Sequence, residues 1–219
     1  GESLTFEAWT PALAQWIRKN NHKNQGDMDD NKMSQFHIDW QKYFKNTEVW
    51  FPKHCEQLKD RRADIVLDNY IVEIQHSSIK PEEVRCRRED YGKHDKQIIW
   101  IIDGENTKVE KLHTDGGGYL ITFDKEWKYK SYEKSYEHVL LDHYDINDKK
   151  HKMFKIRLNN VTTKMIKVYD YKEKDIVIDT LNTNPSNIWD LWKDNNFIIP
   201  KLTISQKGAG NGKTYETWK

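Results

Sequence analysis

The sequence predicts an α/β fold in which a mixed central sheet is flanked by helices. Four short runs rich in β-branched and aromatic residues lie between positions 47 and 102, and amphipathic helical patterns precede and interrupt them. Strands that alternate with helices are typical of α/β domains. The chain has 219 residues, enough for one sizeable core, and aromatic residues make up 12% of it although 32% are charged. Such an aromatic content is typical of a folded chain.

The first half is expected to contain three helices and four strands. Residues 19–31 are polar and predict a loop after the first helix. The third helix has Pro81 and two acidic residues at its start, which are residue types that favour a helix N-terminus. A turn at residues 68–70 joins the second and third strands as a hairpin. The expected helices are 4–18, 32–44 and 80–94, and the expected strands are 47–51, 63–67, 70–75 and 96–102.

The second half is less strongly patterned and is expected to be rich in strands. A short helix is expected at residues 184–196, and there is no internal repeat. No linker rich in Pro, Gly and Ser separates two domains before about residue 200. The expected strands are 116–124, 138–145, 152–161 and 165–181. The predicted organisation is an N-terminal helix and loop at 1–30, a core at 31–105, a β-rich extension at 106–200 and a separate segment at 201–219.

Composition restricts the possible functions. The chain has 36 Lys and Arg against 35 Asp and Glu, so a nucleic-acid site would have to be a local basic patch. Two cysteines, Cys55 and Cys86, cannot form a disulfide framework, which favours a reducing environment. The longest strongly apolar run, residues 98–102, is too short to cross a bilayer, and no signal segment opens the chain. We therefore expect an intracellular protein, cytoplasmic or nuclear, that has no membrane partner and is not secreted.

Two carboxylates stand where buried strands would be expected to carry apolar side chains. Asp64 opens the run IVL, and Glu73 lies between Val72 and Ile74. In an antiparallel hairpin the two can converge, and their mutual repulsion and desolvation would be relieved by a divalent cation with oxygen ligands. Gln75 shares the strand face of Glu73, because side chains alternate with a period of two. The alternatives are that Asp64 pairs with a neighbouring arginine and that Glu73 lies on a solvated face.

Five motifs follow one another along the chain: His37-x-x-Trp40, RRADI at 61–65, VEIQHSSI at 72–79, Arg87-x-x-x-Tyr91 and IIWII at 98–102. Together, and in this order, they resemble the CoiA-like nucleases of the PD-(D/E)XK superfamily. The resemblance covers about residues 30–105, with a weaker likeness in the strands to about residue 160. It implies a restriction-endonuclease-like core that hydrolyses DNA phosphodiester bonds with Mg²⁺ or Mn²⁺. It implies that Asp64 and Glu73 bind the metal, and that Gln75 takes the place of the usual lysine.

The glutamine changes the expected chemistry, because it can orient a water molecule but carries no charge. Lys80 or Arg87 would then supply the missing positive charge. Arg87 and Tyr91 lie one helical turn apart and resemble the element that contacts the DNA backbone in RecB-like relatives. The alternative for this pair is a surface ion pair between Arg87 and Glu83 beside a core tyrosine.

Other metal ligands come from the same resemblance. RecB-like nucleases place a histidine of the first core helix on the metal, which implies this role for His37. The alternative is a histidine satisfied within an aromatic core. Glu48 and Glu56 compete for the role of an additional acid, and Glu48 is favoured because it heads the first expected strand. Structural zinc is not expected, because the cysteines and histidines lack the spacing of a zinc site.

The segment 201–219 carries a separate signal. Its run GAGNGKT, residues 208–214, follows a strand-like stretch and resembles the phosphate-binding loop of UvrD-like superfamily 1 helicases, although Lys207 stands where a strict motif has glycine. Gly212, Lys213 and Thr214 would bind nucleotide. The alternative is a flexible glycine-rich tail. Since only five residues follow Thr214, we expect the sequence to be the N-terminal part of a nuclease-helicase, with ATP used only by the full-length protein.

The function predicted is a metal-dependent nuclease domain that acts on DNA in replication, repair or recombination. Whether the DNA is single-stranded or duplex is left open. The alternative is a catalytically inactive nucleic-acid-binding module that retains the fold, which the glutamine at position 75 keeps open. A nucleic-acid surface is also expected from aromatic residues that alternate with lysines, the alternative being a polar sheet face. These aromatic residues are Trp127, Tyr129, Tyr132 and Tyr136.

Overall fold

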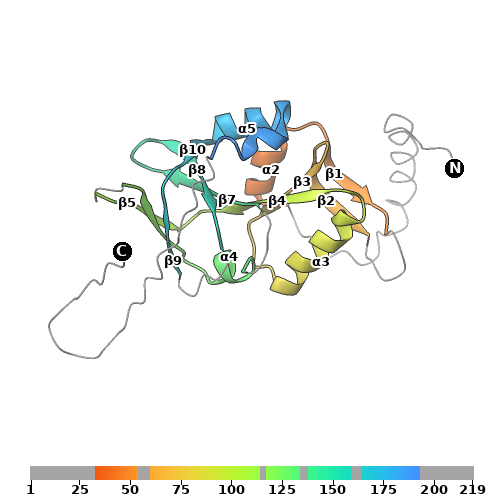
Figure 1. Ribbon diagram of the computed structural model, residues 1–219, viewed down its shortest axis with the longest axis horizontal. Coiled ribbons are helices and arrows are strands. Elements are labelled where there is room, and N and C mark those ends of the chain that lie inside the picture. The colour runs from red at the N-terminus through yellow and green to blue at the C-terminus, as the bar shows by residue number, and fades with distance from the viewer. Residues whose placement is uncertain (1–32, 54–59, 114–116, 134–137, 159–163, 193–219) are drawn as a thin grey trace.

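The centre of the molecule is a seven-stranded mixed sheet with helices on both faces (Figure 1). The computed structural model describes residues 33–53, 60–113, 117–133, 138–158 and 164–192. The helices are α2 (Gln35–Gln41), α3 (Pro81–Gly92), α4 (Trp127–Lys130), α5 (Lys174–Thr183) and the 3-10 helix η1 (Pro185–Ile188). The strands are β1 (Thr47–Phe51), β2 (Arg61–Val66), β3 (Tyr70–Gln75), β4 (Gln97–Asp103), β5 (Lys108–Lys111), β6 (Tyr119–Thr122), β7 (His138–Asp145), β8 (Lys150–Ile156), β9 (Met165–Val168) and β10 (Lys172–Glu173).

The large sheet has the strand order β1-β2-β3-β4-β7-β8-β10. Strands β3, β4 and β7 are parallel to their neighbours in this group, and the outer pairs are antiparallel. Helix α3 connects β3 to β4 and forms the crossover that a parallel pair requires. Strands β5, β6 and β9 form a second, antiparallel sheet. The predicted fold class is therefore confirmed.

Two hydrophobic cores lie on opposite faces of the large sheet. Side chains of α3, α4 and the small sheet pack on one face, and side chains of α2, α5 and η1 pack on the other. The central strand β4 contributes to both, since Trp100 points into the first core and Ile99 and Ile101 into the second. Burial on both sides explains why residues 98–102 are continuously apolar.

A buried carboxylate joins the second core to the sheet. Asp142 on β7 is 2% exposed and accepts a hydrogen bond from Nε1 of Trp40 on α2, at 2.8 Å. The same carboxylate interacts with Nδ1 of His151 at 2.7 Å and with Nζ of Lys174, at the start of α5, at 3.2 Å. Burial raises the pKa of Asp142, but the hydrogen bonds from His151 and Trp40 and the charge of Lys174 outweigh burial, so this pKa lies below its ordinary value. Asp142 thus fixes α2 and α5 to the same strand.

The element order predicted for residues 32–102 is confirmed, but the strand expected over 165–181 is wrong in its second part. Strand β9 ends at Val168, β10 has two residues, and residues 174–183 form α5. Val177, Ile178 and Leu181 have helical spacing and are all buried against the second core. Packing of this apolar stripe outweighs the local preference of the run IVI for a strand.

The aromatic nucleic-acid surface expected near residue 127 is also wrong. Residues 127–130 form α4, where Tyr129 is 4% exposed and Lys128 is 3% exposed, and Tyr132 just beyond is fully buried. Nζ of Lys128 pairs with Asp124 at 2.8 Å. Tyr129 and Tyr132 belong to the first core and cannot stack on nucleic-acid bases, and Lys128 is buried in its ion pair.

Several predictions fall outside the described residues. They are the helix and loop over 4–31, Glu56, Tyr136 and the segment 201–219 with Gly212, Lys213 and Thr214. Among the helices that the structure describes, none has the length and apolar character needed to cross a membrane.

Candidate active site

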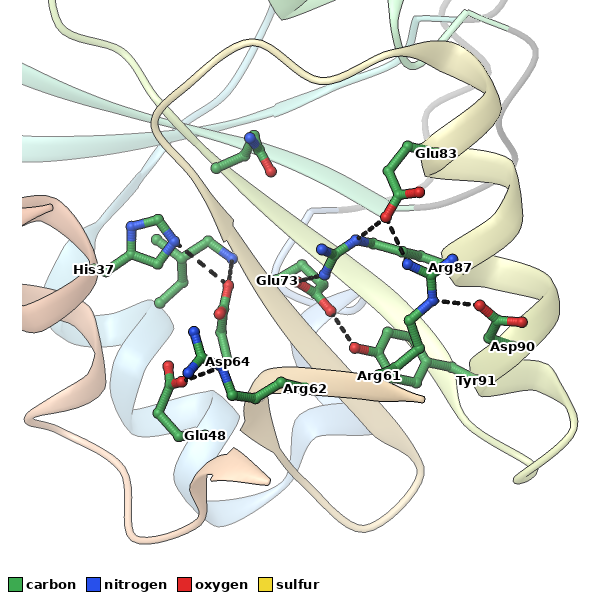
Figure 2. Close-up of polar contacts among 12 residues, drawn as sticks. His37, Glu48, Arg61, Arg62, Asp64, Glu73, Glu83, Arg87, Asp90 and Tyr91 are labelled. Atoms are coloured by element: carbon green, nitrogen blue, oxygen red, sulfur yellow. Dashed lines mark hydrogen bonds and ion pairs between the residues drawn. The ribbon is translucent and has the colours of Figure 1, made fainter. Parts of the chain in front are cut away.

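Asp64 lies where β2 and β3 separate. The paired residues of the two strands are Ile65 with Val72 and Val66 with Ile71. At the next position, Oδ2 of Asp64 accepts a hydrogen bond from the backbone N–H of Ile74 at 2.7 Å. The carboxylate therefore occupies a place that a backbone carbonyl would fill in a regular ladder. This holds Asp64 at the opening between the two strands (Figure 2).

Glu73 points toward α3 and is 2% exposed. Its Oε1 accepts a hydrogen bond from the hydroxyl of Tyr91 at 2.6 Å, and its Oε2 accepts one from Arg87 at 2.8 Å. The solvated-face alternative for Glu73 is wrong. Arg87 and Tyr91 reach the same carboxylate because they lie four residues apart on α3, as their spacing predicts.

Burial raises the pKa values of both Asp64 and Glu73. Desolvation raises the pKa of Asp64 to about 6 and the pKa of Glu73 to about 7. The negative charge of Asp64 raises the pKa of Glu73 further, whereas Arg87 and Tyr91 lower it. The two carboxyl groups interact directly, so they titrate as a pair. Ionising both carboxyl groups in this shielded site is therefore unfavourable, and a bound cation would stabilise the ionised pair.

A chain of ion pairs behind Glu73 holds α3 against β2. Arg87 also contacts Glu83, at 3.1 Å, and Glu83 contacts Arg61 of β2, at 2.6 Å. Arg61 in turn pairs with buried Asp90 (Figure 2). The ion pair between Arg87 and Glu83 that the sequence suggested is present, and Arg87 also reaches Glu73 in the candidate site. Its expected contact with the DNA backbone stays a prediction.

Neither neighbouring arginine neutralises Asp64. Arg61 points to α3, and Nε of Arg62 pairs with Glu48 at 2.7 Å. The alternative that Asp64 serves only as an ion-pair partner of these arginines is therefore wrong. Glu48 adopts a left-handed backbone conformation, with φ of 56°, and accepts a hydrogen bond from Gln41 at 2.5 Å. Its charge raises the pKa of Asp64, so Glu48 lies near enough to affect the site.

His37 lies on the opposite side of Asp64 from α3. Its Nε2 is 3.6 Å from Oδ2 of Asp64, and its Nδ1 is 2.8 Å from the hydroxyl of Ser34, the N-cap of α2. Burial lowers the pKa of His37, which favours the neutral imidazole that a metal ligand requires. The ring is only partly buried and contacts a carboxylate, which does not fit the alternative of an aromatic-core histidine.

Gln75 is the last residue of β3, and Lys80 directly precedes α3. The side-chain amide of Gln75 donates a hydrogen bond to the backbone carbonyl of Ser77 at 2.6 Å. Lys80 is exposed and is the N-cap residue of α3. The structure thus brings Asp64, Glu73, His37 and Glu48 together, with Arg87 and Tyr91 behind Glu73.

Sequence reasoning did not identify Gln41, which donates hydrogen bonds both to Glu48 and to the backbone carbonyl of Asp64, the latter at 3.2 Å. A signal was present, since Gln41 is one helical turn after His37 on the same helix. It also did not identify a group of potential ligands at the ends of β3 and β4, namely His76, Asp103 and Glu105.

One comparison with known proteins gives a match. A family model described as competence protein CoiA, nuclease-like domain, matches residues 38–185. The matched segment includes β2, β3 and α3 with Asp64, Glu73 and Gln75, and it begins one residue after His37. No curated protein and no solved structure gives a match. Because the match spans more than half of the 219 residues, the chain belongs to the CoiA nuclease-like domain family.

Proposed function

We propose that this domain is a metal-dependent nuclease that hydrolyses DNA phosphodiester bonds, with Asp64 and Glu73 as the metal-binding carboxylates. The observation that carries the proposal is the buried Glu73 beside the partly buried Asp64, at the opening between β2 and β3, with pKa values raised to about 7 and about 6 respectively. Burying two interacting carboxylates is costly unless a cation or a proton compensates them. Membership in a nuclease-like family supports a nucleic-acid substrate.

The donor atoms fit Mg²⁺ or Mn²⁺. Each oxygen of Glu73 accepts one hydrogen bond, from Tyr91 or from Arg87, and retains a further lone pair. With Asp64 the site offers carboxylate oxygens, the ligands that hard divalent cations prefer. His37 would add a neutral nitrogen, and its Nδ1 contact with Ser34 leaves Nε2 directed at Asp64. A bound ion would lower the pKa of a coordinated water and offset charge on the phosphoryl group.

The other residues have roles that do not depend on the ion. Arg87 is a fixed positive charge beside Glu73, so it would supply the charge that a lysine at position 75 would otherwise bring. Tyr91 fixes the orientation of Glu73. Gln75 would orient the attacking water through its amide once that amide leaves the carbonyl of Ser77. Lys80 is exposed at the start of α3 and would contact a DNA phosphate.

We also propose that the domain works within a nuclease-helicase that acts in DNA replication, repair or recombination. Residues 208–214 support this through their resemblance to a phosphate-binding loop. Lys213 and Thr214 would bind ATP phosphates only in a protein that carries the rest of a helicase.

The second candidate function is a nucleic-acid-binding module without activity. The observation that favours it is Gln75, which brings no positive charge to the site and whose amide is already bound to Ser77. In this case the carboxylates would be buried remnants, and Lys80 and Arg87 would serve binding alone.

A cleavage assay separates the two candidates. Labelled single-stranded and duplex DNA would be incubated with Mg²⁺, Mn²⁺ or EDTA and with the wild type, Asp64→Asn or Glu73→Gln. We expect metal-dependent cleavage that each substitution reduces by at least about a hundredfold. Glu110→Gln, which changes an exposed carboxylate of β5, is the matched control and should cleave normally. Absence of cleavage with either metal, with DNA binding retained in all variants, would establish the inactive module.

A further inference from the structure

A second group of metal-ligating side chains lies where two parallel strands end. His76 directly follows β3, Asp103 is the last residue of β4, and Glu105 is two residues further on. The register of β3 and β4 pairs Gln75 with Ile102, so His76 and Asp103 come next on the two chains. One ligand atom from each of the three side chains lies within 4.8 Å of the other two.

Asp103 is a buried carboxylate with little charge compensation. It is 8% exposed, its Oδ2 lies 2.5 Å from Nδ1 of His76, and its Oδ1 accepts the backbone N–H of Glu105 at 2.8 Å. On the next strand it stands opposite Asp142, which is also buried. Lys174 pairs with Asp142, and Nζ of Lys128 donates to the backbone carbonyl of Glu105 at 2.7 Å. Within the described ranges, however, no lysine or arginine forms an ion pair with the carboxylate of Asp103 or Glu105. Compensation of Asp103 therefore depends on the imidazole of His76.

Strand β7 holds the end of β4 in place, at Asp103, together with the turn that carries Glu105. The backbone N–H of Gly104 donates to the carbonyl oxygen of Asp142 at 2.8 Å. A Cβ atom at Gly104 would lie 2.4 Å from the same oxygen, so only glycine permits this close approach. Gly104 thereby fixes Asp103 and Glu105 on either side of it, before any ligand binds.

We propose that His76, Asp103 and Glu105 form a second divalent-cation site, separate from the Asp64–Glu73 pair. One imidazole nitrogen and two carboxylate oxygens suit Mn²⁺, Co²⁺ or Zn²⁺ better than Mg²⁺. The cation would take the place of the hydrogen bond between His76 and Asp103, and the neutral imidazole would keep its one proton on the ring nitrogen that does not bind the ion. The side chain of His76 is 42% exposed and Glu105 is exposed, so a hydrated ion can reach the site.

The second site borders the candidate active site. His76 lies three residues after Glu73 in the sequence, and its ring centroid is 6.3 Å from that of Phe36, the residue before His37. A cation here would place positive charge at the rim where a nucleic-acid phosphate approaches the first site. The existence of the site does not depend on the proposed reaction, because it uses different ligands.

Mn²⁺ binding by the full 219-residue chain tests the proposal. The starting protein is the double variant Asp64→Asn/Glu73→Gln, in which the first site lacks both carboxylates. Titration calorimetry and the electron paramagnetic resonance signal of free Mn²⁺ would count the bound ions. We expect one bound Mn²⁺ per double variant. Adding His76→Ala or Glu105→Gln should weaken that binding by at least about tenfold, and adding Glu110→Gln should not change it.

The outcomes distinguish the two sites. A double variant that binds no Mn²⁺ overturns the second site and leaves the first intact. Binding that survives both His76→Ala and Glu105→Gln also overturns it. Conversely, a wild type that binds a single Mn²⁺, lost with Glu105→Gln but not with the double substitution, supports the second site and argues against the first. Glu105→Gln changes an exposed side chain, so it keeps the test valid if His76→Ala fails to fold.

Discussion

In EDTA, raising the pH from 4.5 to 7.5 should lower the free energy of unfolding of this domain. In the folded protein the pKa of Asp64 is about 6 and that of Glu73 about 7, whereas their ordinary values are 3.8 and 4.5. Between these limits the folded state binds more protons than the unfolded state. The contribution of the two carboxyl groups to the free energy of unfolding is therefore fully present at a pH below their ordinary pKa values. It is lost as the pH rises through their pKa values in the folded protein.

The size of the loss follows from the same values. Folding raises the proton affinity of each carboxylate by more than about a hundredfold, and each tenfold change corresponds to about 1.4 kcal/mol. Each group therefore contributes roughly 3 kcal/mol to the free energy of unfolding at low pH. Both side chains are well shielded, with exposed fractions of 15% for Asp64 and 3% for Glu73, so solvent screening is small. Because the pair titrates together, a combined loss on the order of 3–6 kcal/mol is expected.

Urea denaturation followed by tryptophan fluorescence would measure this loss. The wild type and Asp64→Asn/Glu73→Gln would be compared at pH 4.5 and pH 7.5 in EDTA, so that the titration of all other groups cancels. We expect the wild type to lose at least about 3 kcal/mol more than the variant. Mg²⁺ at pH 7.5 should restore stability to the wild type alone, since it prefers the oxygen ligands of the first site. Equal pH dependence in the two proteins would refute the reasoning.

Two further substitutions test contacts around the site. Arg87→Met removes the cation that lowers the pKa of Glu73, so this pKa should rise above about 7. Calorimetry should then show that Mg²⁺ binding needs a higher pH than in the wild type. An unchanged pH dependence of Mg²⁺ binding would contradict the role of the ion pair. Trp40→Phe leaves buried Asp142 without one hydrogen-bond donor and should cost about 1–3 kcal/mol in urea denaturation, with Tyr43→Phe on the exposed side of the chain as the neutral control.

The carboxylate pair was predictable from the sequence because its signal is local. Asp64 and Glu73 interrupt apolar runs that a short turn joins, and a hairpin brings such positions together whatever the rest of the fold does. The shared face of Arg87 and Tyr91 followed from helix periodicity. Both side chains reach Glu73 because α3 crosses over the sheet from β3 to β4. The spacing of Arg87 and Tyr91 in the sequence does not specify this crossover.

The remaining features depend on contacts between distant segments. Residues 174–183 contain a run with strand preference, and they form a helix because their apolar stripe packs against α2 and η1. Tyr129 and Tyr132 are buried because the small sheet closes over them. His76 and Asp103 lie 27 residues apart, and their contact depends on β3 and β4 being adjacent and parallel. Such a neighbourhood is visible only once the strand order is known.

The position of Asp142 limits how this domain can be shortened. The division at residue 105 stays a prediction, but β7 lies in the middle of the sheet, between β4 and β8. A chain that ended before residue 138 would leave the isoleucine-rich β4 as an open edge, which is a template for aggregation. It would also release α2, because Trp40 would lose its acceptor, and His37 with it. Expression of a minimal nuclease-like domain therefore needs the polypeptide through α5, even though the candidate catalytic side chains all precede residue 92.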